Sequence, residues 1–333
     1  MDEIKKILVP TDFSINAETV YPVAQEVAAR FESVIDFIHV IPNVKYLQEN
    51  LLNIEMPINL EEEVIPELTG KAENELRNAM DRFLKADNKG RAFVKLDRKP
   101  SKTITRHARD NGYDLIIIGA KGKDESGMFR GSTATNIIRS STLPVLSVDD
   151  QLNLDNLKNV MLPTDTSLLS FAAFPMAAGF AALFNSDITL LHVLEKHNPV
   201  FGTSKTPDDD ELHTVYESII QQLENFISDS ETGNISIHRT AEPFEDMAVL
   251  SGGNIDHTVQ LKTKIISGVS AHDEIKNHAE QFADLLVLTT HGYSGKQLLD
   301  LGSNAEKIAR EVEKPVITVQ PAKDLFRKEH YTS

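Results

Sequence analysis

The chain of 333 residues contains no cysteine and no tryptophan. Without cysteine there can be no disulfide bond, no thiolate metal site and no cysteine nucleophile, which fits a reducing compartment. Long apolar runs are missing as well. The start, "MDEIKKILVPTD", has an apolar run too short for the core of a signal peptide, and no later run approaches a membrane span. We therefore expect a cytoplasmic protein.

Positive charge is scarce. Lysine and arginine total 34 against 50 aspartates and glutamates, the formal net charge is −16, and there is no long basic run. An acidic surface repels phosphate backbones and anionic headgroups, so we expect neither nucleic acid nor membrane as a partner. The hydrophobic content of 41% and the charged content of 25% are typical of a globular protein, here long enough for two domains.

The sequence contains an internal repeat. "KKILVPTDFS" near the start returns as "KNVMLPTDTS", with Asp12 and Asp165 lying 153 residues apart. "DLIIIG" and "DLLVLT" begin 170 residues apart, at Asp114 and Asp284, so the second copy is longer between these markers. The chain therefore consists of two copies of one domain. We expect domains at 1–150 and 156–321, an insertion at about 228–260 in the second, and a C-terminal tail at 322–333.

Short apolar runs alternate with longer segments of helical period in each copy. This pattern is typical of an α/β fold, in which parallel strands are covered by helices on both faces. It predicts two tandem open sheets of five parallel strands each. The predicted strands are Lys6–Val9, Val34–Val40, Phe93–Leu96, Asp114–Gly119 and Val145–Val148 in the first copy, and Val160–Leu162, Asp187–Val193, Thr263–Ile266, Asp284–Leu288 and Val316–Val319 in the second.

The first helix of the first copy illustrates the local signals. Ser14 is a candidate N-cap, and apolar residues recur at steps of three and four from Val20 to Phe31. Pro22 either lies in the first turn of this helix or kinks it.

Four glycines stand in "GAKGKDESGMFRGST", Gly119–Thr133, between the fourth strand and the last helix of the first copy. Ligands bind at the carboxyl ends of the strands in open sheets of this kind, and a helix N-terminus favours an anion. Glycine lets the backbone approach phosphate oxygens closely. The stretch is therefore a candidate phosphate loop, and a tight strand-to-helix turn with a good cap is an equally open interpretation.

Several of these motifs together resemble the universal stress protein family in a tandem form. They are "VPTD" after the first strand, a second strand ending in "HV", the Gly-rich loop leading to Gly-Ser, and the closing "PVLSV". The resemblance covers nearly the whole chain except the insertion and the tail. It implies a Rossmann-like fold of the adenine nucleotide alpha hydrolase type. Members that bind ATP carry a Gly-x2-Gly-x9-Gly-Ser/Thr loop for the phosphates and ribose, and other members lack this loop and do not bind ATP.

The resemblance implies nucleotide-binding residues in both copies. They are Asp12, Val40, Gly119, Gly122, Gly131, Ser132 and Thr133 in the first, and Asp165, Val193, Gly292, Gly302 and Ser303 in the second. Lys121 and His291 are further candidates beside the loops.

Both loops depart from the family pattern. Only eight residues separate Gly122 from Gly131, and Thr289 replaces the first glycine of the second loop. A threonine side chain at a position of close approach could obstruct a nucleotide, so we favour the first copy for occupancy.

Simpler interpretations stay open for two of these features. A helix cap or Asx turn alone would explain Asp12 and Asp165. "LSGGNID", Leu250–Asp256, is similar to the loop of ATP pyrophosphatases, but it lies in the insertion instead of after the first strand of a domain.

We see no nucleophile paired with a base, no Walker lysine pattern and no carboxylate cluster for catalytic magnesium. Whether the protein is an enzyme stays undecided, and slow ATP hydrolysis is the most that we expect.

The sequence thus favours a stress-response regulatory module that binds ATP or AMP, with or without Mg²⁺, and passes its occupancy to an unidentified protein partner. A scaffold for protein interactions with empty pockets is the alternative, and an ATP-using enzyme of the same fold group is a third reading. We expect the strands "PVLSV" and "PVITV" to pair the copies as an intramolecular pseudo-dimer, with further dimerisation left open.

Overall fold

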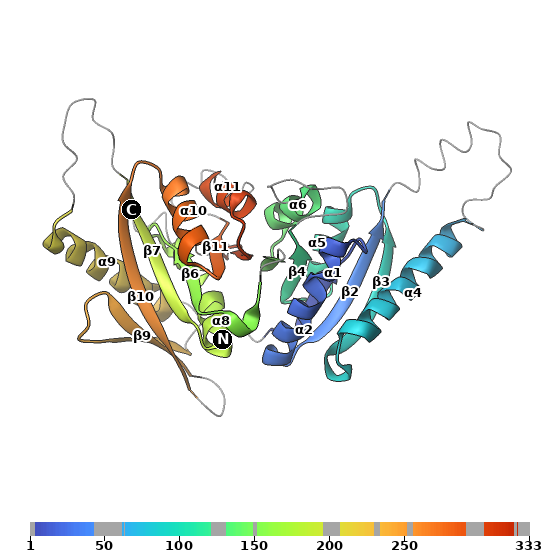
Figure 1. Cartoon of the computed structure of the whole chain (residues 1–333), viewed down its shortest axis with the longest axis horizontal. Helices are drawn as coiled ribbons and strands as arrows, with labels where there is room; N and C mark the ends of the chain where they lie inside the picture. The colour runs from blue at the N-terminus through green and yellow to red at the C-terminus, as the bar shows by residue number, and fades with distance from the viewer. Residues whose placement is uncertain are drawn as a thin grey trace. The chain divides into compact units, whose positions relative to one another are not determined.

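The structure is a computed structural model that describes residues 4–42, 62, 64–120, 131–148, 152–195, 207–229, 234–251, 256–290, 303–322 and 325. The chain divides into two compact units, one spanning Glu3–Asp150 and the other containing Gln151–Ser333. We call them the first and the second repeat. Figure 1 colours the first repeat from blue to green and the second from green to red.

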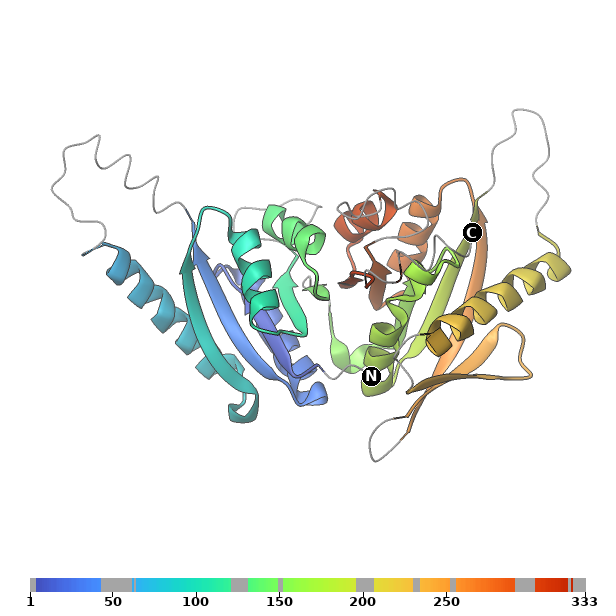
Figure 2. The ribbon, with the colours of Figure 1, turned by 180° about the vertical axis from the view of Figure 1, so that it is seen from behind.

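The first repeat is built on a parallel sheet with the strand order β3-β2-β1-β4-β5. Its strands are β1 Lys6–Pro10, β2 Val34–Ile41, β3 Lys89–Leu96, β4 Leu115–Gly119 and β5 Val145–Val148. Its helices are α1 Ile15–Glu18, α2 Val20–Phe31, α4 Ile65–Phe83, α5 Pro100–Asp110 and α6 Ser132–Ser140, with a 3-10 turn, η2, at Ala86–Asn88. Helices α2 and α4 pack together on one face of the sheet, and α5 and α6 on the other (Figures 1 and 2).

The second repeat has the strand order β12-β11-β6-β7-β10-β9-β8. Its strands are β6 Asn159–Pro163, β7 Asp187–Glu195, β8 Ile235–Arg239, β9 Glu245–Leu250, β10 His257–Gly268, β11 Leu285–Thr289 and β12 Val316–Val319. Its helices are α7 Leu168–Phe171, α8 Phe174–Phe184, α9 Asp209–Asp229, α10 Ala271–Phe282 and α11 Ser303–Glu311, with a 3-10 turn, η3, at Leu154–Asn156. The predicted α/β class and the predicted parallel core of both repeats are confirmed.

The second sheet departs from the predicted five strands, because β8 and β9 extend it as an antiparallel hairpin beside β10. They arise from the insertion, whose strand β9 alternates between half-buried and buried residues. Such alternation lets one face of a strand cover the core while the other meets solvent. The motif "LSGGNID" begins at Leu250, the last residue of β9, and its two glycines lie outside the described residues.

The first helix is divided in two, as α1 and α2, around Thr19. Ser14 caps α1 through its side chain, which accepts a hydrogen bond from the amide of Ala17 at 3.1 Å. Pro22 sits in the first turn of α2, where it has no N–H to donate and its ring would clash with the carbonyl of Glu18 in a continuous helix. The predicted apolar stripe of α2 is buried. In the part of the chain that the structure describes, no helix has the length and apolarity to cross a membrane.

We predict that Gly90→Ala destabilises the first repeat. A Cβ at Gly90 would collide with Oδ1 of the buried Asp36 and lie 2.8 Å from the carbonyl oxygen of Ile35. Relieving the collision requires a backbone shift, so the free energy of unfolding should fall by about 1–3 kcal/mol in urea denaturation. Gly70→Ala is the control, because no atom lies within 4 Å of its added Cβ, in helix α4, and it should gain about 0.5–1 kcal/mol. Equal stability of Gly90→Ala and the unchanged chain would contradict the prediction.

Candidate functional site

The turn after β1 is held by its own side chains. The hydroxyl oxygen of Thr11 accepts a hydrogen bond from the amide of Phe13 at 3.0 Å, and Oδ1 of Asp12 accepts one from the amide of Ser14 at 3.0 Å. Phe13 adopts a positive φ of 60° between them. The backbone of Thr11 stays beside β2, because its amide donates to the carbonyl of Ile38 at 2.9 Å. Asp12 therefore forms an Asx turn, as the simpler interpretation predicted.

The second repeat reproduces this turn after β6. The hydroxyl of Thr164 accepts from the amide of Thr166 at 3.0 Å, and Oδ1 of Asp165 accepts from the amide of Ser167 at 3.1 Å. Thr166 has a φ of 69°, which matches the positive φ of Phe13. Both aspartates are exposed, so the Asx turns leave their carboxylates accessible from solvent.

The two repeats secure the turn threonine by different hydroxyl groups. Thr11 Oγ1 lies 2.5 Å from Tyr21 Oη, whereas Thr164 Oγ1 lies 2.7 Å from Ser170 Oγ. Burial raises the pKa of Tyr21 to about 12, so its phenol is neutral and can donate. Phe174 follows Tyr21 by 153 residues and has no hydroxyl group, and Ser170 supplies the missing one.

A histidine near the carboxyl end of the second strand faces the turn in each repeat. Nδ1 of His39 lies 2.8 Å from the carbonyl oxygen of Thr11, and Nδ1 of His192 lies 2.8 Å from that of Thr164. The neutral ring must carry its proton on Nδ1 to donate to a carbonyl, which leaves Nε2 as an acceptor. The sequence indicated these histidines only as part of the "HV" at the end of the second strand, although their equal spacing from Asp12 and Asp165 could have indicated a shared contact.

The Gly-rich loop of the first repeat begins and ends at one place. The amide of Gly131 donates to the carbonyl of Ala120 at 2.7 Å, and the amide of Ala120 donates to the carbonyl of Val148 on β5 at 2.6 Å. Gly131 is the N-cap of α6 with a φ of −60°, and no side chain caps it through a hydrogen bond. Ser132 and Thr133 follow it and are exposed. Lys121 and Gly122 lie outside the described residues.

The corresponding part of the second repeat is described only at its ends. Strand β11 ends at Thr289, which is 9% exposed, and the amide of Thr290 donates to the carbonyl of Val319 at 2.9 Å. Helix α11 begins at Ser303. The other predicted residues of this loop lie outside the described residues; these are His291, Gly292 and Gly302.

The strand order brings most of the remaining candidates to one edge. Strands β2, β1 and β4 are hydrogen-bonded neighbours, so their carboxyl ends place Val40, Asp12 and Gly119 side by side along the sheet. Val40 is buried and Val193, its counterpart on β7, is half-buried. Within the described residues no group of three or more His, Asp or Glu side chains could hold a metal ion.

The fold and the position of the candidate site define the class of protein. It is a tandem pair of doubly wound α/β domains with a candidate site at the carboxyl ends of the strands. The family model described as "Universal stress protein family" matches residues 3–149 and 156–320. The chain thus belongs to the universal stress protein family, in the tandem form that the sequence predicts.

The chain is also similar to individual proteins and solved structures. Universal stress protein MJ0577 of Methanocaldococcus jannaschii is 28% identical over 153 residues, covering 43% of this chain and 94% of that protein. A universal stress protein structure from Archaeoglobus fulgidus matches the fold over 97% of this chain and 98% of its own, with a TM-score of 0.61 at 17% identity. A universal stress protein solved in complex with cAMP is 18% identical and covers 45% of this chain and 99% of its own, with a TM-score of 0.30.

We predict that Asp12→Asn and Asp12→Ala distinguish the contribution of the Asx turn to stability from that of the carboxylate charge. Asparagine keeps an oxygen for the amide of Ser14, so the free energy of unfolding should change by less than about 0.5 kcal/mol. Alanine removes the acceptor and should cost about 0.5–2 kcal/mol, as for a lost cap. Thermal and urea denaturation measure both, and equal stability of the two variants would show that the Asx turn contributes nothing.

Proposed function

We propose that this universal stress protein is a regulatory module that binds ATP or AMP at the carboxyl edge of its parallel sheet, mainly in the first repeat. The observation that carries the proposal is the hydrogen bond from Gly131 to Ala120, which brings the start of α6 back to the end of β4. The two ends of the loop are thus held together beside a helix N-terminus.

The first turn of α6 suits a phosphate group. The amides of the first turn of a helix have no partner within the helix, and the helix dipole adds positive potential there. Gly131 contributes no side chain that would cap these amides, and the exposed hydroxyls of Ser132 and Thr133 are placed to donate as well. This combination favours an anionic ligand over an empty, self-capped turn.

The other end of the ligand would meet the turn after β1. Asp12 follows β1, Val40 lies near the end of the neighbouring strand β2, and Oδ1 of Asp12 holds the Asx turn. A carboxylate fixed by its own turn is preorganised to accept hydrogen bonds from an adenine or ribose group. Lys121 directly follows Ala120 in the sequence, and we propose it as a cation for the phosphate groups.

The first repeat is the better candidate for occupancy because of the residue that ends its fourth strand. Gly119 presents no side chain, whereas Thr289 at the matching place is β-branched and almost completely buried. A ligand that approaches the backbone here would meet the threonine side chain in the second repeat. Binding of nucleotide by one repeat and not the other would suit a regulatory module whose nucleotide-bound state is recognised by a protein partner.

Calorimetric titration of ATP and AMP into the intact chain, with magnesium present, tests the proposal. Gly122→Val and Gly292→Val form a matched pair, because the family motif puts both glycines at the same place of the two loops. We expect saturable ATP binding that weakens at least about tenfold in Gly122→Val and stays unchanged in Gly292→Val.

Two outcomes would contradict parts of the proposal. No heat of binding and no shift of the melting temperature at millimolar ATP would refute nucleotide binding and favour the protein-interaction scaffold. The Asx turns after β1 and β6 are compatible with that alternative, because their hydrogen bonds lie within the protein. Loss of binding in Gly292→Val alone would keep the nucleotide and move it to the second repeat.

A further inference from the structure

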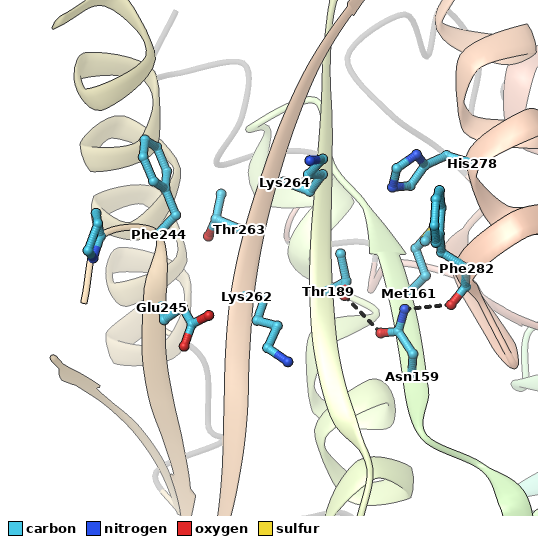
Figure 3. Close-up of a pocket in the computed structure, with 11 residues that line it drawn as sticks. Asn159, Met161, Thr189, Phe244, Glu245, Lys262, Thr263, Lys264, His278 and Phe282 are labelled. Carbon is cyan, nitrogen blue, oxygen red and sulfur yellow. Dashed lines mark hydrogen bonds between the residues drawn. The ribbon is translucent and has the colours of Figure 1, made fainter. Parts of the chain in front are cut away.

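A cavity of about 350 Å³ lies in the second repeat, on the face of the sheet that α10 covers (Figure 3). Asn159 of β6, Thr189 of β7 and Lys262 and Lys264 of β10 line it from the sheet. His278 and Phe282 line it from α10. Asn159 and Thr189 stand near the amino ends of their strands, so the cavity is distinct from the carboxyl edge at which the nucleotide is proposed to bind.

The first repeat identifies what fills this position in the same fold. Thr189 and Asn159 follow Asp36 and Lys6 by 153 residues, in strands that pair in the same register. Lys264 pairs with Leu191 as Phe93 pairs with Ile38. Ala283 corresponds to Tyr113, because each directly precedes the aspartate that receives the amides at the start of the first strand; these are Asp284 and Asp114.

The first repeat fills this space with an aromatic ring and a carboxylate. Tyr113 is 2% exposed, and its hydroxyl donates to Oδ2 of Asp36 at 2.7 Å. Burial raises the pKa of Tyr113, so the phenol stays protonated as the donor. Nζ of Lys6 lies 4.1 Å from the centroid of the Tyr113 ring and 4.0 Å from Oδ2 of Asp36. The ring, the carboxylate and the cation thus satisfy one another.

The second repeat lacks both the ring and the carboxylate, since Ala283 and Thr189 stand in their places. The amide of Asn159, in the place of Lys6, closes a neutral pair of hydrogen bonds. Its Oδ1 accepts from Thr189 Oγ1 at 2.8 Å, and its Nδ2 donates to the carbonyl of Phe282 at 2.8 Å, as the dashed lines of Figure 3 show. The floor of the cavity is therefore satisfied without any occupant, and no tyrosine ring extends over it from the position of Ala283, which is itself buried in the core.

The charges around the cavity are not balanced in the same way. Nζ of Lys262 lies 2.8 Å from Oδ2 of Asp187. The carboxylate of Glu245, whose Oε2 accepts a hydrogen bond from the neutral amide of Gln260 at 2.6 Å, lies on the side of the cavity away from α10 (Figure 3). Lys264 is exposed and forms no ion pair within the described residues. Burial and then the charge of Lys264 lower the pKa of His278, so this ring stays neutral to a lower pH than an ordinary histidine. Lys264 thus supplies positive potential beside an aromatic wall.

The aromatic wall comes from α10. The rings of His278 and Phe282 lie 4.6 Å apart, and 56% of Phe282 is exposed. A neutral imidazole and a phenyl ring side by side suit a flat aromatic guest. The cavity volume is at the lower end for ligand sites, which favours a small molecule. One lysine without arginines or a cluster of amides suits a carboxylate better than a phosphate.

We propose that this cavity binds a small aromatic carboxylate, whose ring occupies the space that Tyr113 fills in the first repeat and whose carboxylate pairs with Lys264. The two repeats would then solve one packing problem differently, the first with its own side chains and the second with a ligand. The site is independent of the proposed nucleotide site.

Calorimetric titration of the whole chain with benzoate and 4-hydroxybenzoate tests this proposal, with neutral benzamide as the comparison. We expect dissociation constants on the order of 1 mM for the two acids and at least about tenfold weaker binding of benzamide. Ala283→Tyr restores the ring of the first repeat and should abolish binding. Lys264→Gln should weaken it about tenfold, whereas Lys102→Gln, the same charge change on the exposed face of α5, should leave it unchanged.

The ring signals of His278 in NMR spectra, assigned with His278→Gln, locate the ligand. They should shift with benzoate, and saturating ATP should not reverse the shift. Equal affinity for benzamide and benzoate, unchanged binding in Lys264→Gln, or displacement by ATP would each overturn the proposal. If circular dichroism shows that Ala283→Tyr is not folded, the comparison of Lys264→Gln with Lys102→Gln decides.

Discussion

One carboxylate in each repeat holds the first strand against the fourth. Oδ2 of Asp114 accepts hydrogen bonds from the amides of Lys5 and Lys6, both at 2.9 Å. Oδ2 of Asp284 accepts those of Lys158 and Asn159 at 2.8 and 3.0 Å. These bonds lie where the strand order reverses, so they set the register of the two strands that flank the candidate site. A slip by one residue would turn every buried side chain of the strand to the other face.

The carboxyl edge inherits its geometry from that register. When β1 and β4 are aligned, the turn after β1 lies beside the end of β4. The Asx turn of Asp12 and the hydrogen bond from Gly131 to Ala120 therefore follow neighbouring strands. Neither requires a ligand in order to form, because each uses hydrogen bonds within the protein. A preformed edge lowers the ordering cost of binding, and the same hydrogen bonds would also hold an edge that binds nothing.

The sequence predicted what depends on periodicity and local chemistry. Alternating apolar runs and the repeat of Asp12 at Asp165 were sufficient to predict the parallel core and the tandem arrangement, and Ser14 was recognisable as a cap. The family followed from the resemblance of several motifs together. The division at Thr19 and the hairpin of the insertion depend on a proline clash and on edge pairing, which periodicity does not encode. Contacts between distant side chains, such as the hydroxyl of Tyr113 with the carboxylate of Asp36, were not predictable because they follow from strand pairing.

Divergence between the repeats follows the same division. Both repeats keep the turn at the carboxyl edge of the sheet. Its hydrogen bonds join backbone groups and short side chains, so they do not depend on whether a ligand is bound. The face under α5 and α10 changed instead, and it had to change in concert. Removing Asp36 alone would leave the phenol of the buried Tyr113 without its acceptor, and removing Tyr113 alone would leave a void beside a buried carboxylate. The neutral pair of Asn159 and Thr189 avoids both costs. Replacement of both residues together explains how the same fold has this face filled by side chains in the first repeat and a cavity in the second. The base of the cavity then carries no unsatisfied charge.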